Sequence, residues 1–491
     1  MESSSLKAPG RRDFVKGMAS AALLGGVAGK SASALSTQDA GKTEARKRPN
    51  VILYVADETR WDFIRAYGLN PTARTPNLDR IFEHGTTFTH AVTNQPLCSP
   101  SRACMMTGRY ATETNVWTLG RQLSHDLPTL ASVLREHGYT ANFIGKWHLS
   151  DVSQANKETL GFVKPEDRGG FLDLWEGSNV LELTSHPYSG TIWDGAGHPI
   201  TWHDQYRVDF LTDRAVHFLR QPQEKPFFLF VSQLEPHQQN DEQRMVAPNG
   251  YAERFQNPYV PADLLHLPGN WQQQLPDYYG CIEKIDESVG RVLQTLEETN
   301  MLDNTIFLFT SDHGCHFKTR NNEYKRSPHD SSIRIPFLLQ GPGLNQSLAL
   351  PEITGHIDLA PTLLDAAGVT VPSSMKGKSL MLLVRDPEAR RQWDDPQLIQ
   401  ISQSMVARAI RTREWTYCVA APALDGGKVE SSTEYQEYLM YNNYADPAQL
   451  VNLAGRAEYK QDASQLRDQL VRMIQESGEG APTITPARLY P

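Results

Sequence analysis

Four apolar runs in this chain each end at ionisable side chains, and this pattern limits the fold more than any other feature. The runs are NVILYVA, NFIG, KPFFLFV and NTIFLFT, and helical segments separate them. Continuous apolar runs are typical of strands covered on both faces, and their alternation with helices predicts an α/β fold with a large doubly wound mixed sheet. The ionisable residues that follow the runs are Asp57 and Glu58, Lys146 and His148, His237, and Asp312 and His313.

These side chains are candidates for one shared site. In open α/β sheets, ligands bind outside the carboxyl ends of the strands, where the four groups would converge. Asp57, Glu58 and Asp312 would repel one another at short range unless a cation pairs them, and three carboxylates suit a hard cation. Any single run could be a strand followed by a polar loop. Four runs that all end in this way favour a metal-binding site.

Cys98 occupies an unusual setting in the stretch QPLCSPSRACMMTGRY. Ser99 is a suitable helix cap and Pro100 suits the first helical position, so we expect a helix to begin here. Cys98 would then lie beside unpaired backbone N–H groups, which favour anions and activated nucleophiles. A lone cysteine is more often a half-buried structural residue, so this stretch alone leaves both interpretations open.

Length and composition indicate a globular protein with two parts. The 491 residues allow one large domain and a smaller one, and 39% hydrophobic with 21% charged residues is ordinary for such a chain. A polar, proline-containing segment around 384–397 predicts a boundary between a catalytic domain at 49–385 and a C-terminal subdomain at 398–491. There we expect an α+β arrangement of antiparallel strands with a terminal helix. The net charge of −9 argues against a nucleic-acid partner.

The N-terminus is predicted to be a targeting segment outside the fold. Arg11 and Arg12 precede a short, glycine-rich apolar run, and Ala32-Ser33-Ala34 is a candidate cleavage site. Residues 1–34 resemble a twin-arginine signal peptide, and a polar linker follows at 35–48. We therefore expect the twin-arginine translocase to export the protein to the periplasm or the extracellular space. The apolar run is too short to span a bilayer, so no stable membrane insertion is expected.

The motifs taken together resemble a known family. CSPSR followed by TGRY is similar to the signature of the type I sulfatases, members of the alkaline phosphatase superfamily. PNVILYVADE, TPNLDRI, GKWHL, TSDHG, SSIRIPFLLQGPG and DLAPTLLDAAG occur in that family's order. The resemblance implies hydrolysis of a sulfate ester to an alcohol and inorganic sulfate. It also implies that a formylglycine-generating or sulfatase-maturating enzyme converts Cys98 to Cα-formylglycine, whose hydrated aldehyde forms a sulfate hemiester and then expels sulfate.

The resemblance also assigns roles to individual residues. The implied metal ligands are Asp57, Glu58, Asp312, His313 and the modified Cys98. Arg102 would hold the formylglycine, and Lys146 and Lys325 would bind sulfate oxygens. His148 would contact the geminal diol, and His237 would protonate the leaving alkoxide or hydrogen-bond the sulfate.

Two positions depart from the family pattern. Glu58 stands where a second aspartate is usual, and His313 stands where asparagine is frequent. Imidazole suits transition metals better than calcium, which weakens the case for a purely oxygen-lined calcium site. The resemblance still makes Ca²⁺ the first expectation for the cofactor, followed by Mg²⁺ or Mn²⁺.

Other interpretations stay open at this stage. A phosphonate monoester or phosphodiester hydrolase could use the same aldehyde and fold, and a non-catalytic binding protein could keep the fold alone. The expected substrate is a sulfated carbohydrate or a small organic sulfate. Residues 171–205 carry Trp175, Tyr188, Trp193 and Trp202, which could line the substrate pocket or anchor a loop to the core.

Overall fold

The computed structural model describes residues 48–152, 160–393 and 396–491. The predicted signal peptide and residues 35–47 of the predicted linker lie outside these ranges. Within them, no helix combines the length and the apolar character needed to cross a membrane. All five cysteines are buried, and none forms a disulfide.

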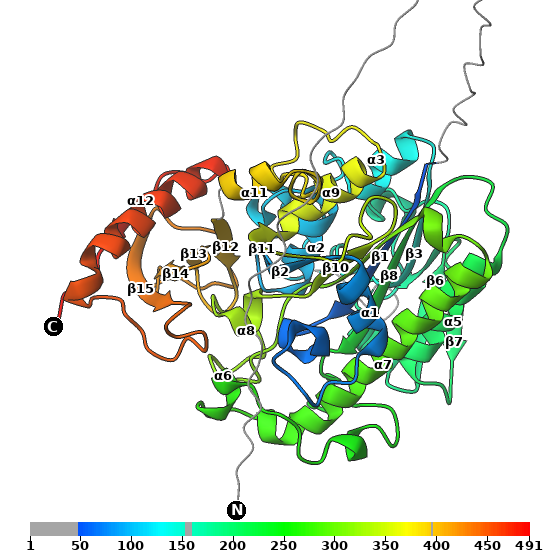
Figure 1. Ribbon diagram of the computed structural model, residues 1–491, viewed down its shortest axis with the longest axis horizontal. Helices are drawn as coiled ribbons and strands as arrows, with labels where there is room; N and C mark the ends of the chain where they lie inside the picture. Colours follow the sequence, from blue (N-terminus) through cyan, green and yellow to red (C-terminus); the bar gives the residue numbers. More distant parts are fainter. Residues whose placement is uncertain (1–47, 153–159, 394–395) are drawn as a thin grey trace, which may run out of the picture. The chain divides into compact units, whose positions relative to one another are not determined.

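An eleven-stranded mixed sheet forms the centre of the larger part of the molecule (Figure 1). Its central strands are parallel, because β1 pairs with β8 and β9, and β3 pairs with β8. β10 runs antiparallel to β2 and β9. In order across the sheet the strands are β11 (Leu348–Gly355), β2 (Thr86–Val92), β10 (Phe337–Gln340), β9 (Thr305–Ser311), β1 (Asn50–Asp57), β8 (Phe227–Pro236), β3 (Thr140–Lys146), β4 (Trp175–Ser178), β6 (Ser189–Asp194) and β5 (Ser185–His186), and β7 (Pro199–Trp202) pairs with β6.

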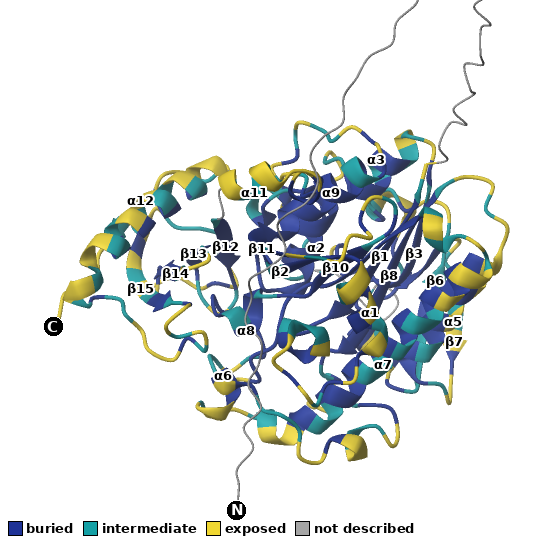
Figure 2. Ribbon diagram, viewed as in Figure 1, coloured by how far each residue is buried: buried dark blue, intermediate teal, exposed yellow. Residues whose placement is uncertain are grey.

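Helices cover both faces of this sheet. Successive side chains of a strand point to opposite sides, so each buried strand presents apolar residues to both layers of helices. Val51, Leu53 and Val55 of β1 pack against one set of helices, which comprises α2 (Cys98–Thr107), α3 (Leu130–Glu136), α9 (Leu359–Ala366) and α10 (Met381–Arg385). Ile52 and Tyr54 pack against the other set, α1 (Pro76–His84), α5 (Arg207–Arg220) and α7 (Trp271–Glu298). The strands between these layers are buried (Figure 2). The shorter helices are α4 (Leu181–Thr184), α6 (Ala262–Leu265), α8 (Asp330–Ile333) and α11 (Pro387–Gln392).

A second, five-stranded sheet lies in the C-terminal part of the chain. Its strands are β12 (Gln397–Ile401), β13 (Ala407–Arg411), β14 (Trp415–Ala420), β15 (Glu434–Asn442) and β16 (Thr483–Thr485). β12 to β15 are antiparallel neighbours, and β16 joins β15 in parallel. Helix α12 (Lys460–Glu476) packs on this sheet through Leu466, Leu470 and Ile474. Together the two sheets confirm the predicted α/β fold with a smaller, mainly antiparallel part.

The start of α2 differs from the sequence-based expectation. The helix begins at Cys98 itself, with Leu97 as the capping residue and Pro100 as the third helical residue. The first turn is already closed by a hydrogen bond from the Ser101 N–H to the carbonyl of Leu97 (2.9 Å). Ser99 therefore lies inside the helix, and its buried hydroxyl has no hydrogen-bond partner among the described residues. The predicted capping by Ser99 is wrong.

The aromatic residues of 171–205 divide into two kinds. Trp175 is 1% exposed and stacks on Phe143 with ring centroids 4.5 Å apart. Trp202 stacks on Phe210 in the same way, at 4.3 Å. These two tryptophans anchor the segment to the core, whereas Tyr188 and Trp193 are half-buried.

Candidate active site

The side chains predicted from the four apolar runs meet at one edge of the large sheet. β1, β9, β8 and β3 are parallel, so their carboxyl ends lie at the same edge. The residues placed there, each at most 8% exposed, are Asp57, Glu58, Lys146, His148, His237, Asp312 and His313. Glu58 also has a left-handed backbone (φ 69°), a sparsely populated conformation that other contacts must maintain for a non-glycine residue.

Cys98 lies among these side chains at the first residue of α2. Its Sγ is 3.2 Å from Nε2 of His313 and 3.2 Å from Nζ of Lys325. Oδ1 of Asp57 is 3.8 Å away. The side chain is only 2% exposed, so these charged neighbours act on it with little screening by water.

The surroundings of Cys98 favour negative charge on its side chain. Burial acts to raise the pKa of the thiol, but Lys146, Lys325 and His313 outweigh it and lower that pKa well below the ordinary value. The sulfur marks the place where a formylglycine would carry its oxygen atoms. Surroundings that stabilise a thiolate would also stabilise negative charge developing on oxygen at this place.

Candidate metal-binding side chains form two overlapping groups among the described residues. One consists of Asp57, Cys98, Asp312 and His313, and the other of Asp57, Glu58 and His237. In each group the ligand atoms all lie within 4.8 Å of one another. The implied ligand set placed Glu58 with the first group, whereas its Oε2 lies 3.1 Å from Nζ of Lys325 and 3.6 Å from Nε2 of His237.

The chemistry of these donors fits a divalent cation. Burial and then the charge of Asp57 raise the pKa of Asp312 to about 6, whereas neighbouring cations, Lys146 first, outweigh burial and hold the pKa of Asp57 well below its usual value. Oε1 of Glu58 is buried and has no hydrogen-bond partner in the described ranges. Carboxylate oxygens, the His313 imidazole and an oxygen at Cys98 are donors that divalent metals accept in proteins.

Arg102 is fully buried and hydrogen-bonds both aspartates. Its Nη2 lies 3.1 Å from Oδ2 of Asp57, and its Nε lies 3.1 Å from Oδ2 of Asp312. Nη1 donates to the carbonyl of Lys146 (2.9 Å) and to Oγ of Ser232 (2.7 Å). The guanidinium thus orients the two acids, whereas the resemblance assigns it to the formylglycine.

Glu182 belongs to the site although sequence analysis did not single it out. Its Oε1 accepts a hydrogen bond from Nζ of Lys146 (3.0 Å) and lies 3.7 Å from Nδ1 of His148. Burial acts to raise the pKa of Glu182, but Lys146 and His148 outweigh it and lower that pKa to about 2. Its other oxygen is buried without a partner. The stretch NVLELTS around it carries no motif, so only the fold identifies this residue.

Comparison with known families and curated relatives gives a consistent result. The sulfatase family model matches residues 49–369, and the model of the C-terminal region of N-sulphoglucosamine sulphohydrolase matches residues 322–476. An ulvan-active sulfatase of Formosa agariphila is 27% identical over 470 residues, which cover 91% of this chain and 85% of the relative. An N-acetylglucosamine-6-O-sulfatase of Bacteroides thetaiotaomicron is 25% identical, with 88% and 87% covered.

Solved structures share the fold. A protein in complex with its substrate D-glucosamine-2-N,6-O-disulfate has a TM-score of 0.74 and 24% identity, covering 88% of this chain and 98% of that one. A phosphonate monoester hydrolase of Silicibacter pomeroyi has a TM-score of 0.67 and 19% identity, with 87% and 96% covered. The family model spans most of the chain, and the curated relatives above are sulfatases. This chain therefore belongs to the sulfatase family and is a sulfuric ester hydrolase.

Proposed function

We propose that the protein hydrolyses a sulfate ester of a saccharide and that the reacting group is at Cys98. The observation that most supports this is the setting of the Cys98 side chain, which is buried at the start of α2 between Lys325, His313 and Asp57. Cations on this side of the site suit an anionic sulfate group. The acids close to them suit a metal that would bind the same group.

Cys98 is proposed to act as Cα-formylglycine, formed by a formylglycine-generating or sulfatase-maturating enzyme. When hydrated, the aldehyde supplies the hydroxyl that attacks sulfur. Lys146 and Lys325 would bind the sulfate oxygens. In the unmodified chain, burial acts against their charge, but the acids and the Cys98 thiolate around them raise the pKa of both lysines above the ordinary value. The acids remain after Cys98 is modified, so we expect both lysines to stay cationic while substrate binds and product leaves.

The two histidines are proposed to contact different groups, His237 the leaving alkoxide or the sulfate and His148 the hydrated aldehyde. His237 would protonate the leaving alkoxide or hydrogen-bond the sulfate. Its Nδ1 lies 2.7 Å from the carbonyl oxygen of Gln238, and its Nε2 lies 3.6 Å from Oε2 of Glu58. His148 would contact the geminal diol. Oε1 of Glu182 lies 3.7 Å from Nδ1 of His148, which is a charge contact without a hydrogen bond.

A divalent cation is proposed to be held by Asp57, Asp312, His313 and the modified Cys98, with Glu58 at the edge of the group. When bound, it would withdraw charge from the sulfate oxygens. Ca²⁺ is the first candidate on family resemblance, and Mg²⁺ or Mn²⁺ is the second. His313 adds a nitrogen donor, and nitrogen donors suit transition metals better than calcium.

The names of relatives favour a sulfated saccharide as the substrate, and charge distinguishes a sulfate ester from a phosphate monoester. The two curated relatives are named as an ulvan-active and an N-acetylglucosamine-6-O-sulfatase, and one fold relative was solved with a disulfated glucosamine. A sulfate monoester carries one negative charge and a phosphate monoester carries two. A single-metal site with two lysines therefore matches a sulfate monoester better than a phosphate monoester, whereas a phosphonate monoester or a phosphodiester carries one charge, as sulfate does. The alternative, a phosphonate monoester or phosphodiester hydrolase, rests on a fold relative with 19% identity.

Parallel assays on matched substrates test this proposal. The purified protein is given an aryl sulfate, a phenylphosphonate ester and a panel of sulfated monosaccharides and disaccharides, with the Cys98→Ala variant as the blank. We expect turnover of aryl sulfate and of at least one sulfated saccharide, with phosphonate hydrolysis slower by orders of magnitude. Faster phosphonate hydrolysis would favour the alternative function.

Metal removal tests the proposed ligands. Exhaustive chelation should abolish turnover, and the order in which Ca²⁺, Mg²⁺ and Mn²⁺ restore it should identify the native ion. Asp312→Asn should lower turnover by orders of magnitude, with partial recovery at high metal concentration. Full activity after chelation, together with full activity of Asp312→Asn, would exclude a metal at these acids.

We also propose that the protein is exported through the twin-arginine translocase. Arg11 and Arg12, with the cleavage motif at 32–34, support this. In the producing cell, replacing both arginines by lysine should leave the protein in the cytoplasm. Export of the double variant at the wild-type level would contradict the assignment.

A further inference from the structure

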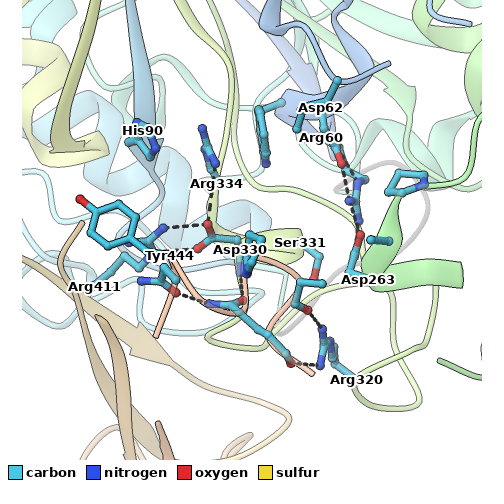
Figure 3. Close-up of a pocket in the computed structure, with 18 of the residues that line it drawn as sticks. Arg60, Asp62, His90, Asp263, Arg320, Asp330, Ser331, Arg334, Arg411 and Tyr444 are labelled. Atoms are coloured by element: carbon cyan, nitrogen blue, oxygen red, sulfur yellow. Dashed lines mark hydrogen bonds and ion pairs between the residues drawn. The ribbon is translucent and has the colours of Figure 1, made fainter. Parts of the chain in front are cut away.

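A cavity of about 250 Å³ lies apart from the candidate active site, and none of the predicted site residues lines it. Its walls come from the segment that follows β1, from α6 and α8, and from the strand ends and the loop after β15 in the second sheet (Figure 3). Five arginines contribute to it: Arg60, Arg320, Arg334, Arg411 and Arg413. We call it the arginine cavity.

Three aspartates balance only some of these arginines. Arg60 forms ion pairs with Asp62 (2.6 Å) and Asp263 (2.9 Å). Arg411 binds Asp330 with two hydrogen bonds, of 2.7 and 2.8 Å. In Figure 3 the Arg60 cluster lies on one side of the cavity, and Arg334, Arg411 and Tyr444 lie on the other. Among the described residues that line the second side, Asp330 is therefore the one acid.

Three arginines have no carboxylate of their own. Arg334 donates to the carbonyl of Thr89, and its Nη1 is 4.0 Å from Asp330, which already pairs with Arg411. Within the part of the chain that the structure describes, Arg320 donates to the carbonyls of residues 448 and 449 and to no carboxylate. Within the described residues, the guanidinium of Arg413 has no ion pair. The positive potential here acts on His90, whose pKa falls to about 3 through burial and then through Arg334 and Arg411.

Polar and aromatic groups complete the cavity. Ser331 is one of the lining residues and is 6% exposed, and its buried hydroxyl has no hydrogen-bond partner among the described residues. Nε of Arg320 is likewise buried and unpaired. Tyr444 is 67% exposed and offers an open ring face beside these donors. Buried donors without partners are costly, so a ligand with acceptor oxygens would relieve that cost.

We propose that the arginine cavity is a second oxyanion site, which takes a sulfate or carboxylate group of an anionic saccharide. Guanidinium groups match planar or tetrahedral oxyanions with paired hydrogen bonds, and an exposed aromatic ring suits the apolar face of a sugar. The volume is below the range of pockets for drug-sized ligands, so it suits one charged sugar unit. The saccharide part of this inference rests on the proposed function, whereas the oxyanion part does not.

Crystallographic soaking tests the oxyanion site directly. Crystals of the full Cys98→Ala chain are soaked in sodium selenate, a sulfate isostere, and anomalous scattering locates the selenium. We expect one peak in the arginine cavity, within hydrogen-bond distance of Arg334, Arg413 or Ser331. A peak at the reacting centre with none in the cavity would overturn the proposal, as would no peak at all.

Kinetics then identify the source of the oxyanion. Arg413→Gln is compared with Arg488→Gln, an exposed arginine outside the cavity. We expect Arg413→Gln to raise the KM for a disulfated disaccharide by roughly three- to tenfold with kcat retained, since one charge-assisted hydrogen bond is lost. The KM for an aryl sulfate should not change, and Arg488→Gln should change neither.

The outcomes separate the two proposals. Selenate in the cavity with an unchanged disaccharide KM for Arg413→Gln would show that free inorganic sulfate is the ligand, which overturns the saccharide assignment. Absence of turnover on every sulfate ester by the wild type would instead contradict the proposed function. The selenate peak would still decide whether the cavity binds an oxyanion.

Discussion

At the scale of single residues, Glu182 is the least expected member of the site. A carboxylate 3.0 Å from Lys146 should repel the sulfate that this lysine is proposed to bind. The same contact fixes the ammonium group, which otherwise has a flexible four-carbon stem. We therefore expect Glu182 to lower sulfate affinity while it holds Lys146 in position, which would help inorganic sulfate to leave after hydrolysis.

Glu182→Gln keeps the size of this side chain and removes its charge. We predict that inorganic sulfate will inhibit the variant several-fold more strongly, because one like charge near the anion is gone. The measurement is the competitive inhibition constant of sulfate against an aryl sulfate, with the exposed Glu166→Gln as the control. An unchanged or larger inhibition constant would show that Glu182 does not act on the bound anion.

At the scale of elements, the sequence predicts the strands whose residues form uninterrupted apolar runs. β1, β3, β8 and β9 are found where apolar runs predict them, because strands buried on both faces need uninterrupted apolar residues. The start of α2 was predicted about two residues too late. Cap preference favours Ser99, but the path of the backbone makes Leu97 the capping residue.

Contacts between distant segments were not predictable in the same way. Lys325 reaches Cys98 from the connection between β9 and α8, and only family resemblance identified it beforehand. Glu182 comes from the short helix α4, whose sequence has no feature that points to Lys146. Both contacts depend on how the chain returns to the sheet edge, which periodicity does not encode.

Helix α1 depends on a carboxylate from α7. Asp286 accepts hydrogen bonds from the backbone N–H groups of Asn77 (3.1 Å) and Leu78 (2.8 Å) at the start of α1. Burial outweighs these bonds and raises the pKa of Asp286 to about 7. The folded state thus holds this proton more tightly than the unfolded chain, so the contribution of Asp286 to stability falls as pH rises from about 4 to about 7.

Asp286→Asn should remove this pH dependence. The melting temperature of the wild type minus that of the variant should fall between pH 5 and pH 7 and then level off above pH 8. One unit of pKa difference corresponds to about 1.4 kcal/mol, so the change should be easily measured. An altered hydrogen bond in the variant would add a constant offset to this change without removing the change itself. Parallel melting curves over the whole range would contradict the raised pKa.

At the scale of the whole molecule, the two sheets share hydrophobic cores. Ile399 and Ile401 of β12 pack with Val92 and Ile353 of the large sheet. Cys104 of α2 belongs to the same cluster as the residues under α12. The predicted boundary between 385 and 398 is therefore crossed by buried contacts, which exposed linkers between independent domains lack.

Removal of 398–491 should expose these apolar surfaces. We predict that the truncated chain will aggregate or stay partly unfolded, and that the C-terminal piece will not fold alone. Size-exclusion chromatography and near-ultraviolet circular dichroism of the two pieces provide the measurement. A monomeric, cooperatively folded 48–397 piece would show that the shared cores are dispensable.

The central claim is that Cys98 reacts as formylglycine in a metal-assisted sulfate site. Peptide mass spectrometry of catalytically active protein, isolated from a host with the maturating enzyme, tests this most directly. The account predicts a peptide about 18 Da lighter at Cys98 than the unmodified sequence, as expected for a thiol converted to an aldehyde. Its abundance should rise in proportion to turnover across preparations. Fully active protein in which Cys98 is an unmodified thiol would contradict the account.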